Sequence, residues 1–211
     1  SALVFELSKV QLDHVRQRIV SRLRNIDEDL AKRVATGLAI DLPEKAKAAR
    51  EPVALRVSDA LSIQKQADDT LKGRKVGILF AEGSDKASID KLKASIENEG
   101  GTAFLVAPKV GGIPVKGGTL KADGQLAGSP SVLFDAVASI LMPDAAKNLA
   151  KAGAAVQLFM DAYGHCKTIA HCKGTQVLLE KANVEKDPGV VPIEEFMNVR
   201  AKRHWGREPN V

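Results

Sequence analysis

Lys75-Val-Gly-Ile-Leu-Phe-Ala81 is the stretch that decides the fold of the larger part of this sequence. The run is short, almost continuously apolar and bounded by charged residues, which is typical of a parallel β-strand buried on both faces. Residues 102–107 supply a second run of this kind. Between the two runs, apolar residues recur at helical spacing and end at a glycine pair: Ile89, Leu92, Ile96, Gly100 and Gly101. The order strand, helix, strand predicts a parallel crossover unit.

The same alternation continues along the chain. We expect a strand within residues 133–141, a helix from Pro143 that closes at Gly153, a strand over 168–170 and a helix that begins at Gly174. Residues 156–160 either continue the preceding helix or form a short strand, and Lys121-Ala-Asp-Gly124 is predicted to be a hairpin turn. Residues 74–211 are therefore predicted to form an α/β, flavodoxin-like domain, with a mainly parallel sheet and helices on both faces.

The first forty residues have helical periodicity and no strand signal. One predicted helix carries a single apolar stripe: Leu12, Val15, Ile19, Leu23 and Ile26. Asp27 is expected to cap a second helix, which ends either at Gly37 or at Asp41-Leu42-Pro43. Two helices of this length cannot bury such a stripe alone, so we expect residues 1–42 to pack against a partner outside this sequence. Residues 43–73 have the composition of an exposed linker.

Composition excludes several classes of function. Apolar residues make up 45% of the 211 residues, but no apolar run approaches the roughly 20 residues of a membrane span, and the N-terminus lacks the pattern of a secretory signal. The net charge is +5, yet aromatic residues are only 4% and acidic residues interrupt the basic helix, which argues against nucleic-acid binding. Cys166 and Cys172 are expected to be reduced thiols. We expect a soluble, cytoplasmic protein.

Cys172 is the best-placed reactive group, because it lies where a predicted strand turns directly into a helix, in Thr168-Ile-Ala-His-Cys-Lys-Gly-Thr175. A helix N-terminus and Lys173 would stabilise a thiolate there and provide backbone N–H donors for an oxyanion. A nucleophile also needs a base. His171 is expected to point to the opposite side of the chain, and His165 lies on the preceding loop. A small, semi-buried thiol that fills space at a close-packed turn is the favoured interpretation.

Two other segments contain candidate residues. Ala81-Glu-Gly-Ser-Asp85 lacks the glycine pattern of a phosphate loop and is predicted to be a tight turn whose Ser84 or Asp85 caps the next helix. Near the C-terminus, Trp205 lies among basic residues, and we expect it to pack and anchor the last turn. No haem, metal or nucleotide signature is apparent.

Ile169-Ala-His-Cys-Lys-Gly174, which follows the Ile78-Leu-Phe-Ala81 strand, resembles the PfpI-like, glutamine-amidotransferase-like superfamily. In that superfamily the cysteine lies at a strand-to-helix turn. A glutamate from the helix after the first strand supports it, as does, in the protease branch, a histidine directly after the cysteine. Those places are occupied here by Ser88 and Lys173. The resemblance therefore implies the fold without the activity.

A closer resemblance covers the whole chain. Phe5-Glu-Leu-Ser-Lys-Val10 and Leu23-Arg-Asn-Ile-Asp-Glu-Asp-Leu-Ala31 resemble the end of the helical region of a haem catalase. Ala162-Tyr-Gly-His-Cys-Lys-Thr-Ile169 and Arg203-His-Trp-Gly-Arg207 are similar to the C-terminal domain found only in large-subunit catalases. The sequence is thus identified as the C-terminal region of such a catalase.

This resemblance implies that the haem site lies in another part of the parent protein. The haem ligand tyrosine, its neighbouring arginine and the distal histidine and asparagine of a catalase lie far upstream of the region resembled, and Tyr163 belongs to the appended domain. We therefore expect no cofactor and no enzyme activity in these residues, with haem and hydrogen peroxide disproportionation in the parent protein. The expected partners are the catalase core of the same protein and a homotetramer.

Three functions compete. The leading one is a non-catalytic accessory domain that stabilises the assembly or modulates access to the core. The second is a holdase-type chaperone that binds unfolded client proteins; it predicts suppression of heat aggregation of a client by the isolated chain, and no suppression above that of an inert protein would exclude it. The third is a cysteine-based hydrolase, glyoxalase or redox enzyme centred on Cys172.

Overall fold

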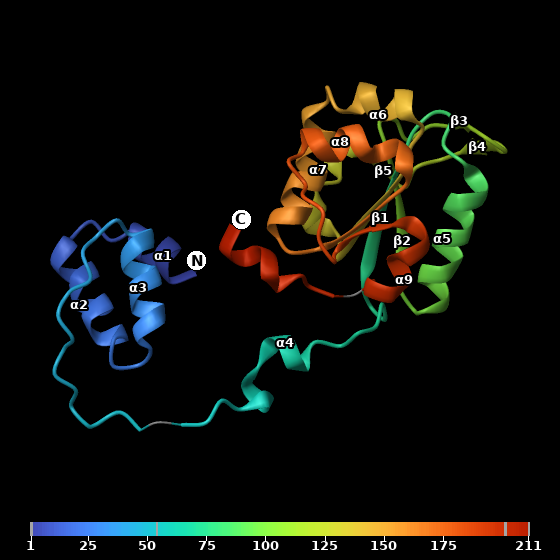
Figure 1. Ribbon diagram of the computed structural model, residues 1–211. Coiled ribbons are helices and arrows are strands. Elements are labelled where there is room, and N and C mark those ends of the chain that lie inside the picture. The colour runs from blue at the N-terminus through green and yellow to red at the C-terminus, as the bar shows by residue number, and fades with distance from the viewer. Residues whose placement is uncertain (1, 54, 201, 211) are drawn as a thin grey trace. The chain divides into compact units, whose positions relative to one another are not determined.

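The computed structural model describes residues 2–53, 55–200 and 202–210. The chain forms two compact units, Ser1–Leu61 and Ser62–Val211. The boundary between them lies inside the stretch 43–73 that the sequence predicts to be a linker. The first unit is helical and the second is an α/β domain (Figure 1).

Three helices form the first unit: α1 (Ala2–Ser8), α2 (Asp13–Leu23) and α3 (Glu28–Gly37). Asp27 caps α3 as predicted, because its carboxylate accepts a hydrogen bond from the Leu30 amide at 2.8 Å. The buried side chains of this unit come from all three helices: Leu7, Val20, Leu23, Ala31, Val34 and Ala35. The unit therefore has a small apolar core of its own.

The predicted two-helix hairpin with one apolar stripe is wrong in two respects. The additional helix α1 contributes Leu7 to the core. Val20 is fully buried, whereas Leu12 and Ile26 at the ends of the predicted stripe are 59% and 77% exposed. Leu12 has extended backbone at the N-cap of α2, and Ile26 lies in the turn after that helix. Neither residue continues the helical periodicity, so neither reaches the core.

The connection between the two units contains two short helical turns, η1 (Asp59–Leu61) and α4 (Ile63–Gln66). Large apolar side chains along it are at least 72% exposed: Val53, Leu55, Val57, Leu61 and Ile63. Leu71, by contrast, is fully buried in the core of the second unit. That core therefore begins before Arg74, where the sequence predicts the domain to start.

Six strands form one sheet in the order β5-β2-β1-β6-β7-β8, and every neighbouring pair is parallel. The strands are β1 (Lys75–Phe80), β2 (Thr102–Ala107), β5 (Gly124–Gln125), β6 (Ala136–Ile140), β7 (Thr168–His171) and β8 (Val190–Pro192). The order β2-β1-β6-β7-β8 is that of flavodoxin-like sheets, with β5 added beside β2. The α/β, flavodoxin-like fold predicted from the sequence is confirmed.

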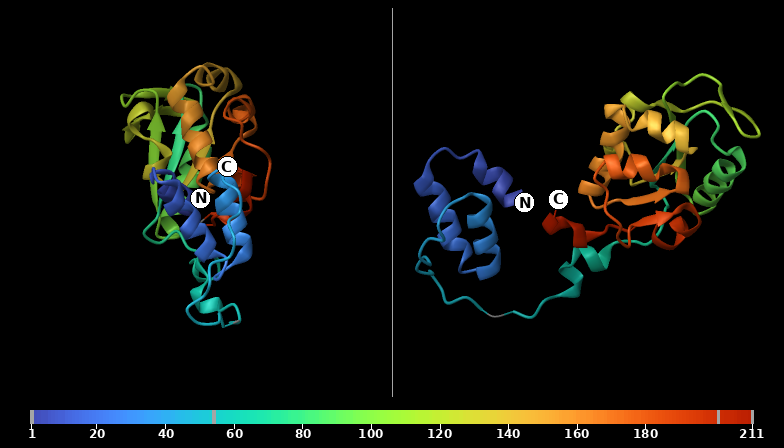
Figure 2. Two further views of the ribbon diagram at one scale, coloured as in Figure 1. Left: turned by 90° about the vertical axis from the view of Figure 1, so that its left-hand side faces the viewer. Right: turned by 45° about the horizontal axis from the view of Figure 1, so that its top comes forward.

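Helices cover both faces of the sheet (Figures 1 and 2). They are α5 (Lys86–Asn98), α6 (Pro143–Leu149), α7 (Gly153–Gly164), α8 (Gln176–Lys181) and α9 (Phe196–Val199). Val76, Ile78 and Phe80 join a core with α5 and α9, whereas Leu79 joins a second core with α6, α7 and α8. Successive side chains of a strand point to opposite faces, so a continuous apolar run such as β1 serves both cores.

The hairpin prediction is wrong. The hairpin consists of β3 (Ile113–Val115) and β4 (Gly118–Leu120), and residues 121–124 do not form its turn. The Asp123 carboxylate instead accepts a hydrogen bond from the Leu105 amide at 2.8 Å, and this contact directs the following residues into β5. A contact with a distant strand therefore overrides the turn preference of Asp-Gly.

Boundaries around β6 also differ from the prediction. The region 133–141 begins with the end of a 3₁₀ turn, η3 (Ser131–Leu133), and its strand is β6 alone. Gly153 begins α7 and does not close α6, and residues 156–160 are helical. The sequence does not predict β8, whose run is only three residues long.

None of the described helices has the length and apolar character needed to cross a membrane.

Candidate functional site

The candidate site lies at the carboxyl edge of the sheet. In open α/β sheets ligands bind where the strand order reverses, which here is between β1 and β6. The loops after these two strands are therefore the first place to examine, and Cys172 follows the neighbouring strand β7.

The loop after β1 forms a tight turn that begins a helix, as predicted. Asp85 caps α5, because its carboxylate accepts hydrogen bonds from the Ser88 hydroxyl at 2.7 Å and from the Ser88 amide at 3.0 Å. These hydrogen bonds, together with the charge of Lys116, lower the pKa of Asp85. The carboxylate is therefore an anionic cap and a poor neighbour for phosphate.

Ser84 links the ends of β1 and β6, the two strands between which the strand order reverses. Its side chain is buried, and its hydroxyl accepts a hydrogen bond from the Ala81 amide at 3.0 Å while donating to the Ile140 carbonyl at 2.6 Å. The end of β1 is thus tied to the end of β6 by a buried side chain.

The Cys172 thiol makes hydrogen bonds with the backbone that follows β6. Sγ donates to the Leu141 carbonyl at 3.1 Å and accepts from the Leu141 amide at 3.2 Å, and the Thr175 hydroxyl lies 3.4 Å away. Gly174 allows the turn after β7 to approach the Leu141 backbone closely, because a Cβ at this position would overlap the Leu141 carbonyl oxygen. This geometry favours a close-packed, semi-buried thiol over an exposed nucleophile.

The structure brings none of the candidate supporting side chains to the sulfur. Ser88 is engaged with Asp85 on α5, and Lys173 is exposed. His171 Nδ1 lies 3.2 Å from the Cys172 carbonyl oxygen, and His165 is exposed at the end of α7. Within residues 2–53, 55–200 and 202–210, no histidine or carboxylate makes a hydrogen bond to Sγ.

The backbone at Cys172 is also relaxed, with φ −84° and ψ 163°. A nucleophile elbow holds its reactive residue in a strained strand-to-helix turn. Among the described residues other than glycine, positive φ occurs at Ala39, Cys166 and Asn183, all outside this turn. Cys172 therefore has the position of an elbow nucleophile without its backbone geometry.

Arg207 holds the C-terminal segment, and the prediction that Trp205 anchors it is wrong. Trp205 is 40% exposed, whereas Arg207 is 4% exposed. The Arg207 guanidinium forms a bidentate ion pair with Asp187, donates to the Lys167 carbonyl at 2.7 Å and stacks 4.4 Å from the Tyr163 ring centre. A guanidinium has five donors and can satisfy all these partners at once, while an indole has one.

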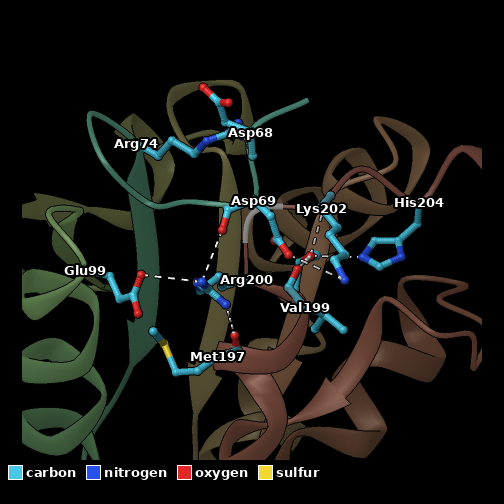
Figure 3. Close-up of polar contacts among 10 residues, drawn as sticks. Asp68, Asp69, Arg74, Glu99, Met197, Val199, Arg200, Lys202 and His204 are labelled. Carbon is cyan, nitrogen blue, oxygen red and sulfur yellow. Dashed lines mark hydrogen bonds and ion pairs between the residues drawn. The ribbon is translucent and has the colours of Figure 1, made fainter. Parts of the chain in front are cut away.

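The residues after α9 hold the end of the linker (Figure 3). Arg200 donates to the Asp69 carbonyl at 3.1 Å and lies 3.5 Å from the Glu99 carboxylate, and Lys202 lies 3.7 Å from the Asp69 carboxylate. Exposed ion pairs contribute little stability individually. Their consequence is positional, because they fix where the chain enters the α/β domain.

His204 is packed between β7 and the loop before β8. Its Nε2 lies 3.0 Å from the Thr168 hydroxyl, and its ring lies so close to Gly189 that a Cβ there would overlap it. Burial, and then the charge of Arg207, lower the pKa of His204. Folding therefore favours the neutral form of this imidazole over the charged form.

Tyr163 does not suit the role of a haem ligand. Tyr163 is stacked by Arg207, and burial together with Asp187 raises its pKa, which disfavours the phenolate that binds haem iron. The described part of the chain also contains no group of three or more histidine, cysteine, aspartate or glutamate side chains placed to hold a metal ion.

Comparison with protein families gives the assignment. Residues 72–202 match the C-terminal domain found in long catalases, and residues 1–38 match a family described as catalase-related immune-responsive. The chain belongs to the long-catalase C-terminal domain family. The resemblance to the C-terminal region of a large-subunit catalase, inferred from the sequence, is confirmed.

Curated relatives agree with this assignment. Catalase C of Rhizobium meliloti is 39% identical over 225 residues, which cover 100% of this chain and 32% of the relative. Catalase HPII of Pseudomonas aeruginosa is 34% identical, covering 90% of this chain and 27% of the relative. Catalase-2 of Bacillus subtilis is 29% identical, covering 98% of this chain and 31% of the relative. The chain thus spans about a third or less of the length of these relatives.

We predict that iodoacetamide alkylates Cys172 at neutral pH no faster than it alkylates N-acetylcysteine. The reason is that the Leu141 backbone makes hydrogen bonds with the thiol, and none of the described histidines or carboxylates does so. Mass spectrometry of the modified peptide gives the rate, and the buried Cys166 serves as an internal control. Alkylation about tenfold faster than that of the free thiol would indicate an activated nucleophile.

We predict that the domain loses stability as the pH falls below about 6.5. The pKa of His204 is lowered from 6.5 in the folded state, so below that pH the unfolded chain binds more protons and the free energy of unfolding decreases. Denaturant unfolding at about pH 7.5 and about pH 5.5 measures the difference, and His204→Gln should reduce it. An equal pH dependence in the variant and the wild type would contradict the assignment to His204.

Proposed function

We propose that this chain is a non-catalytic accessory part of a large-subunit haem catalase, and that the whole protein disproportionates hydrogen peroxide to water and oxygen. The match of residues 72–202 to the C-terminal domain of long catalases carries the proposal. The contacts between the Cys172 thiol and the Leu141 backbone support the absence of a thiol-based activity in this domain.

In this proposal residues 1–42 are the helical end of the catalase core, 43–73 are a linker and 74–211 are the accessory domain. Phe5, Leu12 and Ile26 are 63%, 59% and 77% exposed in the helical unit. These side chains would become buried against the rest of the catalase core, which supplies the partner that the small helical core lacks. The expected assembly is a cytoplasmic homotetramer.

The accessory domain is proposed to stabilise this assembly or to modulate access to its core. Haem would be held by the parent protein alone. The holdase-type chaperone role stays a prediction; the exposed apolar side chains of the linker are compatible with binding unfolded clients. A hydrolase or redox role for Cys172 is disfavoured by its contacts with Leu141.

We predict the behaviour of a variant of the whole protein that is truncated after Leu61. Its peroxide turnover per haem at low temperature should stay within about twofold of the untruncated protein's, but the temperature of half-inactivation should be several degrees lower than that of the untruncated protein. The reason is that the α/β domain contributes stability and no catalytic group. A control with a protease site in the exposed linker, assayed before and after cleavage, separates removal of the domain from a cut in the chain. An unchanged inactivation temperature, or lost turnover at low temperature, would contradict the proposal.

A further inference from the structure

Lys167 is a buried cation at the amino edge of the sheet, opposite the Cys172 turn. It precedes β7 directly and is 5% exposed. Its ammonium donates to the Ser131 carbonyl at 2.6 Å. Across the described ranges this carbonyl is its one hydrogen-bond acceptor, although an ammonium has three donors. A buried charge with a single neutral partner is costly, so a further partner would be stabilising.

Arg203 brings a second positive charge to the same place. The backbones of Lys167 and Arg203 form an antiparallel bridge. The guanidinium contacts are long, at 3.8 Å from the Asp135 carboxylate and 3.5 Å from the His165 carbonyl. Burial and then the charge of Arg203 lower the pKa of Lys167, while Asp135 and Asp161 act in the opposite direction. Lys167 and Arg203 therefore lie close enough for each to feel the charge of the other.

A hollow lies beside these two side chains. Its charged and polar wall consists of Lys167, Arg203, Asp135 and His165, and its apolar wall includes Val132 and Leu133. These two apolar side chains are 70% and 51% exposed. The hollow thus combines two cations, one carboxylate and an uncovered apolar surface.

We propose that this hollow binds the carboxylate group of a small organic acid. The carboxylate would accept hydrogen bonds from the free donors of Lys167 and from the Arg203 guanidinium, which can bind a carboxylate with two N–H groups. A hydrocarbon tail would cover Val132 and Leu133. A singly charged acid with a hydrocarbon tail suits both the cations and the apolar side chains, whereas phosphate would leave Val132 and Leu133 exposed.

Butyrate is a suitable probe, and butyramide has nearly the same shape without the charge. Each is titrated into the ¹⁵N-labelled 211-residue chain while the amide resonances are followed. We expect butyrate to shift the resonances of residues 132–135 and 165–167 saturably, with a Kd below about 50 mM, and butyramide to leave them unchanged. Equal shifts with butyramide, no saturable shift with butyrate, or equal binding of inorganic phosphate would overturn the proposal.

Variants assign the effect to the two cations. Lys167→Met keeps the length of the side chain and removes its charge, and Arg203→Gln removes the second cation; each should weaken butyrate binding at least about tenfold. Lys173→Gln is the matched control, because Lys173 is an exposed lysine at the opposite edge of the sheet. If Lys167→Met does not fold, Arg203→Gln alone tests the proposal. The wild-type Arg203 side chain is 28% exposed and its contacts are long, so we expect this variant to fold. Unchanged binding in Arg203→Gln would overturn the proposal.

Discussion

The backbone of Leu141 is the constraint on which the turn after β7 depends. Its carbonyl and its amide both bind the Cys172 sulfur, and Gly174 packs against the same carbonyl. The Cys172 amide donates to the Ser139 carbonyl at 3.1 Å, so the turn after β7 is held to a residue of β6. Cysteine and glycine at this turn are therefore explained by packing. The residue types of a nucleophile turn can serve structure alone when the thiol's polar contacts are made by the backbone.

Long-range contacts also fix the two ends of the α/β domain. The residues after α9 fix the end of the linker through Arg200 and Lys202, and Arg207 fixes the C-terminal segment through Asp187. The helical unit and the linker, each considered by itself, expose large apolar side chains that a small core cannot cover. These features suit a domain whose contribution is to hold parts of a larger protein together. This is the stabilising role proposed above for the accessory domain.

Local rules account for the elements predicted correctly from the sequence. β1 follows from an apolar run that serves two cores, and the start of α3 follows from the Asp27 cap. The errors come from distant contacts. Asp123 bonds a strand 18 residues away and does not make a turn, and β8 depends partly on the Gly189 carbonyl accepting from the Ile169 amide at 2.8 Å.

The same distinction applies to the candidate sites. The sequence places Cys172 at the correct turn, but its contacts with Leu141 span 31 residues and no spacing rule predicts them. Likewise, no local pattern pairs Arg207 with Asp187, 20 residues away, or indicates that arginine and not tryptophan is buried in the C-terminal segment. The composition of that segment is basic, and basic side chains are usually exposed. The hollow beside Lys167 was also not predicted, because it forms between segments that come together only in the fold.

The most direct test compares haem absorbance and peroxide consumption of the full-length protein with those of the isolated 211-residue chain. We predict that the full-length protein absorbs as a haem protein and consumes hydrogen peroxide, whereas the isolated chain does neither. Peroxide turnover by the isolated chain would contradict the assignment of this region as a non-catalytic accessory domain.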